Sequence, residues 1–152
     1  MKANLTYHLV RLRRFDVTKQ GRGAAARAQE FYQLARKAHY EGNPDLCIYN
    51  LFPACEFSAN VLREKMGKEP SERHEPKLES AGQAYAAGLI TSREFKAYQR
   101  VYQLKTMAQY APYYKPKKKK QNKTERITME ETAQLLEAVG DLIEKAKRYA
   151  AE

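Results

Sequence analysis

Residues 45–66 constrain the fold more than any other part of the chain. The apolar residues of this segment fall on most faces of a helix and not on one stripe, so a helix formed here has to be covered on several sides. Pro44 suits an opening helical turn, and Gly67 suits a helix end. The segment therefore predicts a buried central helix. Its apolar residues are Leu46, Cys47, Ile48, Leu51, Phe52, Cys55, Phe57, Val61 and Leu62.

Four other segments combine apolar residues at helical spacing with recognisable end signals. Two of them begin with a capping box, Thr91-Ser92-Arg93-Glu94 and Thr128-Met129-Glu130-Glu131. Neither an alternation of strands and helices nor a glycine-rich nucleotide loop is present in the sequence. We expect an all-α fold, a compact bundle of four or five helices. The four additional helices are expected over residues 24–41, 76–87 and 91–110 and from Thr128 onward, the last with Ala133, Leu136, Val139, Ile143 and Ala146 inward.

The chain has 152 residues, of which 43% are apolar, enough for one core. No run approaches the roughly 20 apolar residues of a membrane span, and none is typical of a signal peptide, so we expect a cytoplasmic protein without membrane contact. Cys47 and Cys55 lie eight positions apart, about 12 Å along one helix, which exceeds the roughly 7 Å that a disulfide allows. Reduced, buried thiols are the expectation. With His39 they lack the spacing of a zinc site, so no metal or cofactor is predicted.

The charge of the chain is uneven. Lys and Arg number 28 and Asp and Glu 18, a net charge of +10. Residues 1–27 and residues 111–126 each carry a net +6, so the remainder carries −2. We therefore expect a basic N-terminal arm, residues 1–22, on a helical domain, residues 23–152, that includes a basic loop, residues 111–127, before the last helix. Local density of this kind attracts polyanions.

The basic loop is the strongest functional signal, because lysines neutralise phosphates and tyrosine rings stack on unpaired bases. The alternative is a solvated loop without a ligand. No base-reading motif is present, so RNA or DNA would be bound with little sequence preference. The candidate nucleic-acid-binding residues are Tyr113, Tyr114, Lys115, Lys117, Lys118, Lys119, Lys120, Lys123 and Arg126 of the loop, and Arg11, Arg13 and Arg14 of the arm.

Several short motifs, taken in order, give the chain a family resemblance. An alanine-rich first helix precedes an Asp-started, Ala/Cys-rich second helix; His74-Glu75-Pro76-Lys77-Leu78 follows, and then Gly88-Leu89-Ile90-Thr91 leads to a helix that closes with Ala108-Gln109-Tyr110. Over about residues 24–150 this resembles the HEPN superfamily, α-helical domains of prokaryotic defence and toxin–antitoxin systems. The closing tripeptide is similar to the family's Ala-Asp-Tyr, and Lys105 stands where arginine is common. The resemblance implies a HEPN-like bundle and a homodimer.

HEPN ribonucleases carry an arginine followed, after four to six residues, by a histidine, and the pair supports metal-independent RNA cleavage. The corresponding positions before His8, His39 and His74 contain no arginine. The resemblance therefore implies a non-nuclease member, a binding or assembly component often found beside a nucleotidyltransferase-type partner protein.

Two alternatives stay open. The chain could be a ribonuclease or nucleotide-acting toxin with a non-standard site built from His74, Lys105 and Tyr110, since each of these side chains can move protons. It could also be a structural adaptor whose basic loop binds an acidic protein. Glu56, within the apolar helix, is expected to be a partly buried carboxylate paired with a base.

Overall fold

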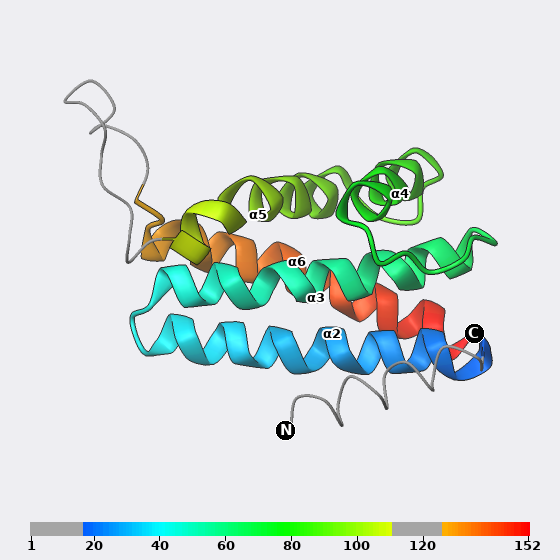
Figure 1. The fold of residues 1–152 in the computed structure, drawn as a ribbon, viewed down its shortest axis with the longest axis horizontal. Coiled ribbons are helices and arrows are strands. Elements are labelled where there is room, and N and C mark those ends of the chain that lie inside the picture. The colour runs from blue at the N-terminus through cyan, green and yellow to red at the C-terminus, as the bar shows by residue number, and fades with distance from the viewer. Residues whose placement is uncertain (1–16, 111–125) are drawn as a thin grey trace.

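The structure, a computed structural model, describes residues 17–110 and 126–152. These ranges form helices and contain no strand, which confirms the predicted all-α class (Figure 1). Residues 1–16 of the expected arm and residues 111–125 of the expected loop lie outside them. The helices are α2 (Val17–Tyr40), α3 (Pro44–Lys65), α4 (His74–Ala86), α5 (Ser92–Tyr110) and α6 (Met129–Ala151).

Helix α3 is the central element, as its sequence predicts. It packs against α2, α4, α5 and α6. Figure 1 shows α2 and α3 as an antiparallel pair, with α5 running along α3 and α4 seen almost end-on. The turn between α2 and α3 uses Gly42 at φ 76°, a left-handed conformation that glycine adopts without strain, and the Asn43 side chain accepts a hydrogen bond from Leu46 N at 3.1 Å.

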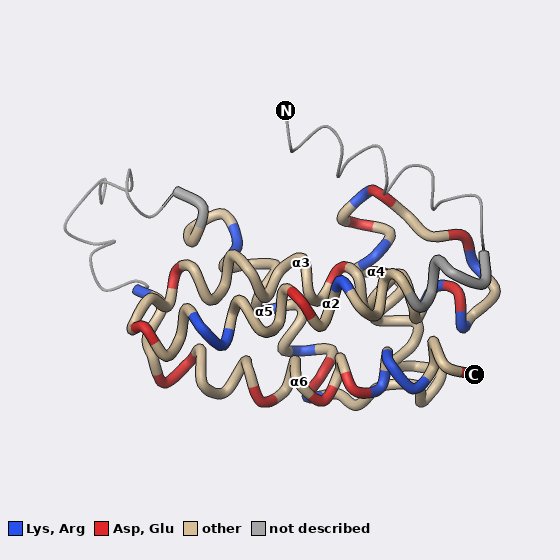
Figure 2. The backbone as a smooth tube through the Cα atoms, turned by 90° about the horizontal axis from the view of Figure 1, so that it is seen from below, with Lys and Arg blue, Asp and Glu red and all other residues tan. Residues whose placement is uncertain are grey.

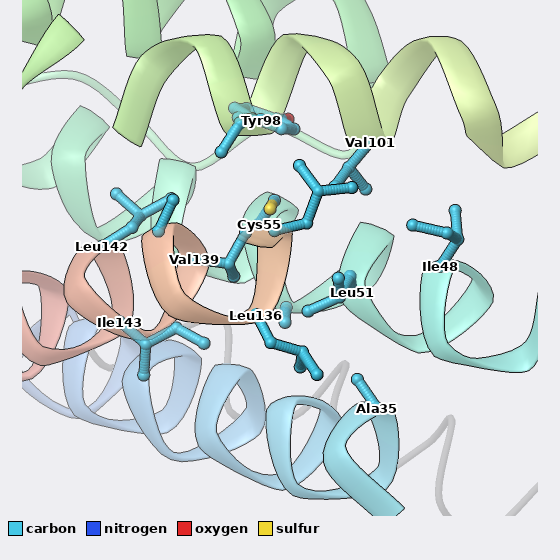
Figure 3. Packing of buried hydrophobic residues seen from close by; sticks show 14 of the residues in the cluster. Ala35, Ile48, Leu51, Cys55, Tyr98, Val101, Leu136, Val139, Leu142 and Ile143 are labelled. Atoms are coloured by element: carbon cyan, nitrogen blue, oxygen red, sulfur yellow. The ribbon is translucent and has the colours of Figure 1, made fainter. Parts of the chain in front are cut away.

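The core lies where α3, α5 and α6 meet. Leu51 and Cys55 of α3, Tyr98 of α5, and Val139 and Leu142 of α6 are all buried and converge there (Figure 3). Both cysteines are free and buried, as expected. Because burial disfavours the thiolate, the pKa of Cys47 rises to about 12 and that of Cys55 rises further, so both side chains act as small apolar groups.

Helix α2 begins earlier than its sequence predicts. The expected start near residue 24 is wrong, because the helix begins at Val17 and runs through Gly21 and Gly23. A glycine inside a helix costs only about 1 kcal/mol relative to alanine. The alanine-rich stretch that follows propagates the helix and overcomes that cost.

One of the predicted inward positions is also wrong. Ala133 is exposed while its neighbour Thr132 is buried. Leu46, one of the apolar residues of α3, is exposed as well. The Thr132 hydroxyl donates to Met129 O at 3.0 Å and accepts from His39 Nδ1 at 2.7 Å, so its polar atoms are satisfied in the interior. This contact ties the last turn of α2 to the first turn of α6.

The first of the two predicted capping boxes forms in full, and the second forms only its threonine half. Glu94 N donates to Thr91 Oγ1 at 3.2 Å, and Thr91 N donates to Glu94 Oε1 at 2.8 Å. At the start of α6, Glu131 N donates to Thr128 Oγ1 at 3.1 Å. The Glu131 carboxylate instead accepts two bonds of 3.2 Å from Arg100, so the cap of α6 also joins α6 to α5.

The described residues include charges of both signs in nearly equal number. Figure 2 shows Lys and Arg interspersed with Asp and Glu over the whole described backbone. The described ranges hold 18 Lys and Arg against 16 Asp and Glu, so only +2 of the net +10 lies on them. Among these helices none is both long and apolar enough to cross a membrane.

Close packing of α2 on α6 yields a first prediction. A Cβ at Gly140 would lie 2.6 Å from the Tyr32 hydroxyl, which donates to Leu136 O at 2.7 Å. Gly140→Ala is therefore expected to lower the free energy of unfolding by about 1–3 kcal/mol, because Tyr32 must move and lose its bond. In the Gly140→Ala variant, Tyr32→Phe should lower the free energy of unfolding by less than it does in the wild type. Urea denaturation measures both free energies.

Gly23→Ala is the matched control, because no atom of another described helix lies within 4 Å of a Cβ at that position. It should stabilise the protein by up to about 1 kcal/mol, the helix-propensity gain alone. Equal effects of the two alanine substitutions would contradict the close approach of Tyr32 to α6.

Candidate functional site

The candidate site is built around Glu56, a carboxylate in the middle of the buried helix α3. Its side chain is 11% exposed. Oε1 lies 3.3 Å from Lys77 Nζ, itself buried, and Oε2 lies 2.5 Å from His74 Nδ1. The expectation of a buried carboxylate paired with a base is confirmed, and the structure adds a second base.

Helix α4 brings both bases to Glu56. His74 and Lys77 stand three positions apart on α4, so they lie on the same face of that helix. The segment before α4 is fastened to α3 by Asn60, which donates to Ser71 O at 3.1 Å and accepts from Ser71 N at 2.8 Å. Arg63 adds a bond of 2.7 Å to Ser80 Oγ. The position of His74 is therefore set by the core and by several side-chain bonds.

The contact with Glu56 fixes how His74 carries its proton. An ionised carboxylate can only accept, so Nδ1 donates, and in the neutral ring Nε2 holds the lone pair. The side chain is 48% exposed, and Nε2 makes no hydrogen bond to any residue of the described ranges. An imidazole oriented by a carboxylate, with its second nitrogen open, can accept a proton or bind a hydrogen-bond donor.

Phe52 links this pair to Lys105. The centroid of the Phe52 ring lies 5.2 Å from that of His74 and 5.9 Å from that of Tyr102. Lys105 Nζ lies 4.4 Å from the Phe52 centroid and 4.2 Å from the Tyr102 centroid, the geometry of a cation–π contact. The structure thus places His74 and Lys105, both singled out from the sequence, against the same aromatic ring.

The third residue of that predicted set, Tyr110, ends α5, and its side chain lies outside the description. Two other tyrosines of α5, Tyr98 and Tyr102, are influenced by the charge of Glu56. Burial raises the pKa of Tyr98, and the Cys55 and Glu56 side chains raise it further; burial, Glu75 and Glu56 raise the pKa of Tyr102. Both hydroxyls therefore stay protonated at neutral pH. The Tyr98 hydroxyl has no hydrogen-bond partner in the described part of the chain.

Sequence reasoning missed Phe52, Lys77 and Tyr102 as members of this site. A signal was available for two of them, because Phe52 and Glu56 are four apart on one helix and Lys77 follows His74 by three. The meeting of α4 with α5 depends on tertiary packing, and no spacing within one helix could have indicated it.

Of the candidate nucleic-acid-binding residues, only Arg126 is described. It is exposed and stands three residues before α6. Lys115, Lys117, Lys118, Lys119, Lys120, Lys123, Tyr113, Tyr114, Arg11, Arg13 and Arg14 lie outside the described residues. In residues 17–110 and 126–152, no group of three His, Cys, Asp or Glu side chains is placed to hold a metal ion.

A separate hollow of about 530 Å³ lies between the start of α5 and α6. Ion pairs already join its charged walls, with Lys145 Nζ 2.6 Å from Glu94 Oε1 and Arg93 Nη1 3.1 Å from Asp141 Oδ2. We therefore interpret this hollow as a structural junction between the two helices.

Neither the known protein families nor the curated proteins contain a match to this chain.

The buried ion pair gives a second prediction. Glu56→Gln is expected to lower the free energy of unfolding by about 3 kcal/mol, because the buried Lys77 ammonium loses its counter-charge. Replacing Lys77 by Met in the same chain should recover part of this loss. Urea denaturation measures both effects, and Glu79→Gln, an exposed change on α4, is the control. A double variant no more stable than Glu56→Gln would contradict the pairing.

Proposed function

We propose that this chain is a HEPN-like, non-catalytic binding or assembly module of a prokaryotic defence or toxin–antitoxin-type system, and that it contacts nucleic acid through residues 111–127. The observation that carries the proposal is the separation of charge. The described residues hold a net +2, so +8 of the net +10 belongs to residues 1–16 and 111–125. Fifteen residues between α5 and α6 include six lysines.

The balance within the helices supports this proposal. Their basic residues are largely engaged with carboxylates, as in the Arg100–Glu131 and Lys145–Glu94 pairs. Cations already paired in this way attract a polyanion weakly, whereas a run of four consecutive lysines presents uncompensated charge. Self-association as a homodimer and a nucleotidyltransferase-type partner are parts of the same proposal, carried by the HEPN resemblance.

Salt dependence tests the proposal. Replacing Lys117, Lys118, Lys119 and Lys120 with Gln should weaken binding of a labelled single-stranded RNA or DNA in fluorescence anisotropy. The slope of log affinity against log salt concentration should also become less steep by up to about 3. Each phosphate contact to a single strand contributes about 0.7 to that slope.

The matched control removes four exposed lysines from the described ranges and hence the same charge: Lys37, Lys68, Lys96 and Lys147 to Gln. This variant should keep most of the wild-type slope. Equal losses in the two variants would mean that total charge governs binding and not the lysine run. Wild-type binding that does not weaken with salt would contradict the proposal, and capture of an acidic protein without nucleic-acid binding would favour the adaptor.

A second candidate function, RNA cleavage at a non-standard site, is favoured by one observation. His74 is oriented by Glu56 and shares the Phe52 ring with Lys105. In such a reaction His74 Nε2 takes the proton of a ribose 2′-hydroxyl, the oxygen attacks the adjacent phosphorus, and the bond to the 5′-oxygen breaks as that oxygen takes a proton from water. Lys105 supplies positive charge for the phosphate.

The enzyme candidate predicts cleavage of RNA without metal, with cyclic phosphate ends, and loss of at least about a hundredfold in rate for His74→Ala, given the usual size of acid–base contributions. Gel assays in EDTA measure the rate. His39→Ala is the control, because the His39 ring bonds to Thr132 at the α2–α6 contact. An intact His74→Ala rate, or no cleavage at all, would leave the binding module as the function.

A further inference from the structure

An aromatic surface with a cation lies on the face shared by α3 and α5. We call it the aromatic shelf and define it as Tyr49, Phe52, Tyr102 and Lys105. Tyr49 is 55% exposed, and it stands three positions before Phe52 and so on the same face of α3. Phe52 and Tyr102 are partly exposed and meet edge to face at an interplanar angle of 67°.

The shelf combines the two features that unpaired nucleotides require. Aromatic rings that reach the surface offer flat faces on which bases stack without regard to sequence. The Lys105 ammonium lies against two of these rings and provides a positive charge for a phosphate. At the far side of Phe52, the half-exposed His74 ring offers a further donor or acceptor.

The place of the shelf in the chain matches the proposed lysine contact. Lys105 is five residues before the end of α5, and six lysines fall within residues 115–123, which follow that helix in the sequence. The positive charge of the sequence that follows α5 thus favours an anionic ligand on the shelf.

We infer that the aromatic shelf stacks the bases of single-stranded nucleic acid, with Lys105 on a phosphate. The inference rests on the proposed function, because the lysines supply most of the attraction, and it adds that unpaired bases, not the backbone alone, are recognised. Duplexes, whose bases are already stacked, bind only through their phosphates.

Paired oligonucleotides test the inference. A labelled 12-nucleotide single strand and an abasic strand of the same length carry the same phosphates but differ in bases. The wild type should bind the base-containing strand about tenfold more tightly or better, the scale expected for one or two stacked bases. Tyr49→Ala and Tyr102→Ala should each weaken that strand about fivefold or more and leave the abasic strand unchanged. Lys105→Gln should weaken both.

Tyr85→Ala is the matched control. Tyr85 is 45% exposed, and its ring stacks on Phe95 near the other end of α4, away from the shelf. Thermal melts by circular dichroism show whether each variant is folded. If Tyr102→Ala unfolds, the Tyr49→Ala variant alone tests the stacking, because Tyr49 is exposed.

Three outcomes would overturn the inference. Equal affinity for the two strands, and equal affinities of Tyr49→Ala and Tyr85→Ala for the base-containing strand, would contradict base stacking on the shelf. Salt-dependent binding through the lysines would remain supported. Binding of neither strand removes both proposals. A Tyr49→Ala variant that changes the mass in light scattering and not the affinity makes the shelf a contact between two copies of the chain.

Discussion

The burial of α3 is the constraint on which the rest of the structure depends. A helix with apolar side chains on most of its faces has to be enclosed, and α2, α5 and α6 enclose most of it. Glu56 sits in the same helix, and a carboxylate in that position needs a partner of opposite charge. Helix α4 supplies that partner as Lys77. The ion pair between Lys77 and the buried Glu56 thus holds α4, the shortest helix of the described ranges, against α3.

That requirement also explains why reactive side chains collect at one place. Glu56 lies at the edge of the core, where the first turn of α4 meets α3. Helix α5 also packs against α3 and α4. Lys77, which pairs with Glu56, lies on the same face of α4 as His74. The rings of Phe52 and Tyr102 are in contact and connect α3 to α5. The same contacts that stabilise the junction therefore present His74 and Lys105 at its surface.

The net charge of the chain lies mostly outside the described residues, which hold +2 of the +10. Within the described ranges, ion pairs connect α5 to α6. An exposed pair such as Arg93–Asp141 stabilises a protein by at most about 1 kcal/mol, whereas the Glu94 carboxylate of the Lys145–Glu94 pair is 3% exposed. Apolar packing is the main source of stability.

Much of the fold could be predicted from the sequence because its signals are local. Apolar spacing and the two threonine-led caps predict the helices, and the wide apolar set of α3 predicts its central place. The start of α2 could not be predicted, because Gly21 and Gly23 signal a break that the neighbouring alanines overcome. Thr132 replaced Ala133 in the interior because a partner 93 positions away, His39, satisfies its hydroxyl.

The candidate site was predicted in part. His74 and Lys105 could be singled out by residue type, and Glu56 by its place among apolar neighbours. Their meeting at Phe52 depends on how α4 and α5 pack on α3, and no local pattern in the sequence encodes that geometry.

The bond between His39 and Thr132 has a consequence for the chemistry of both helical histidines. Because the threonine hydrogen already goes to Met129 O, only lone pairs face the ring, so His39 carries hydrogen on Nδ1, as His74 does opposite Glu56. Most free histidine in water prefers the other tautomer. Both interhelical contacts therefore use Nδ1, and the opposite nitrogen of each ring takes no part in joining the helices.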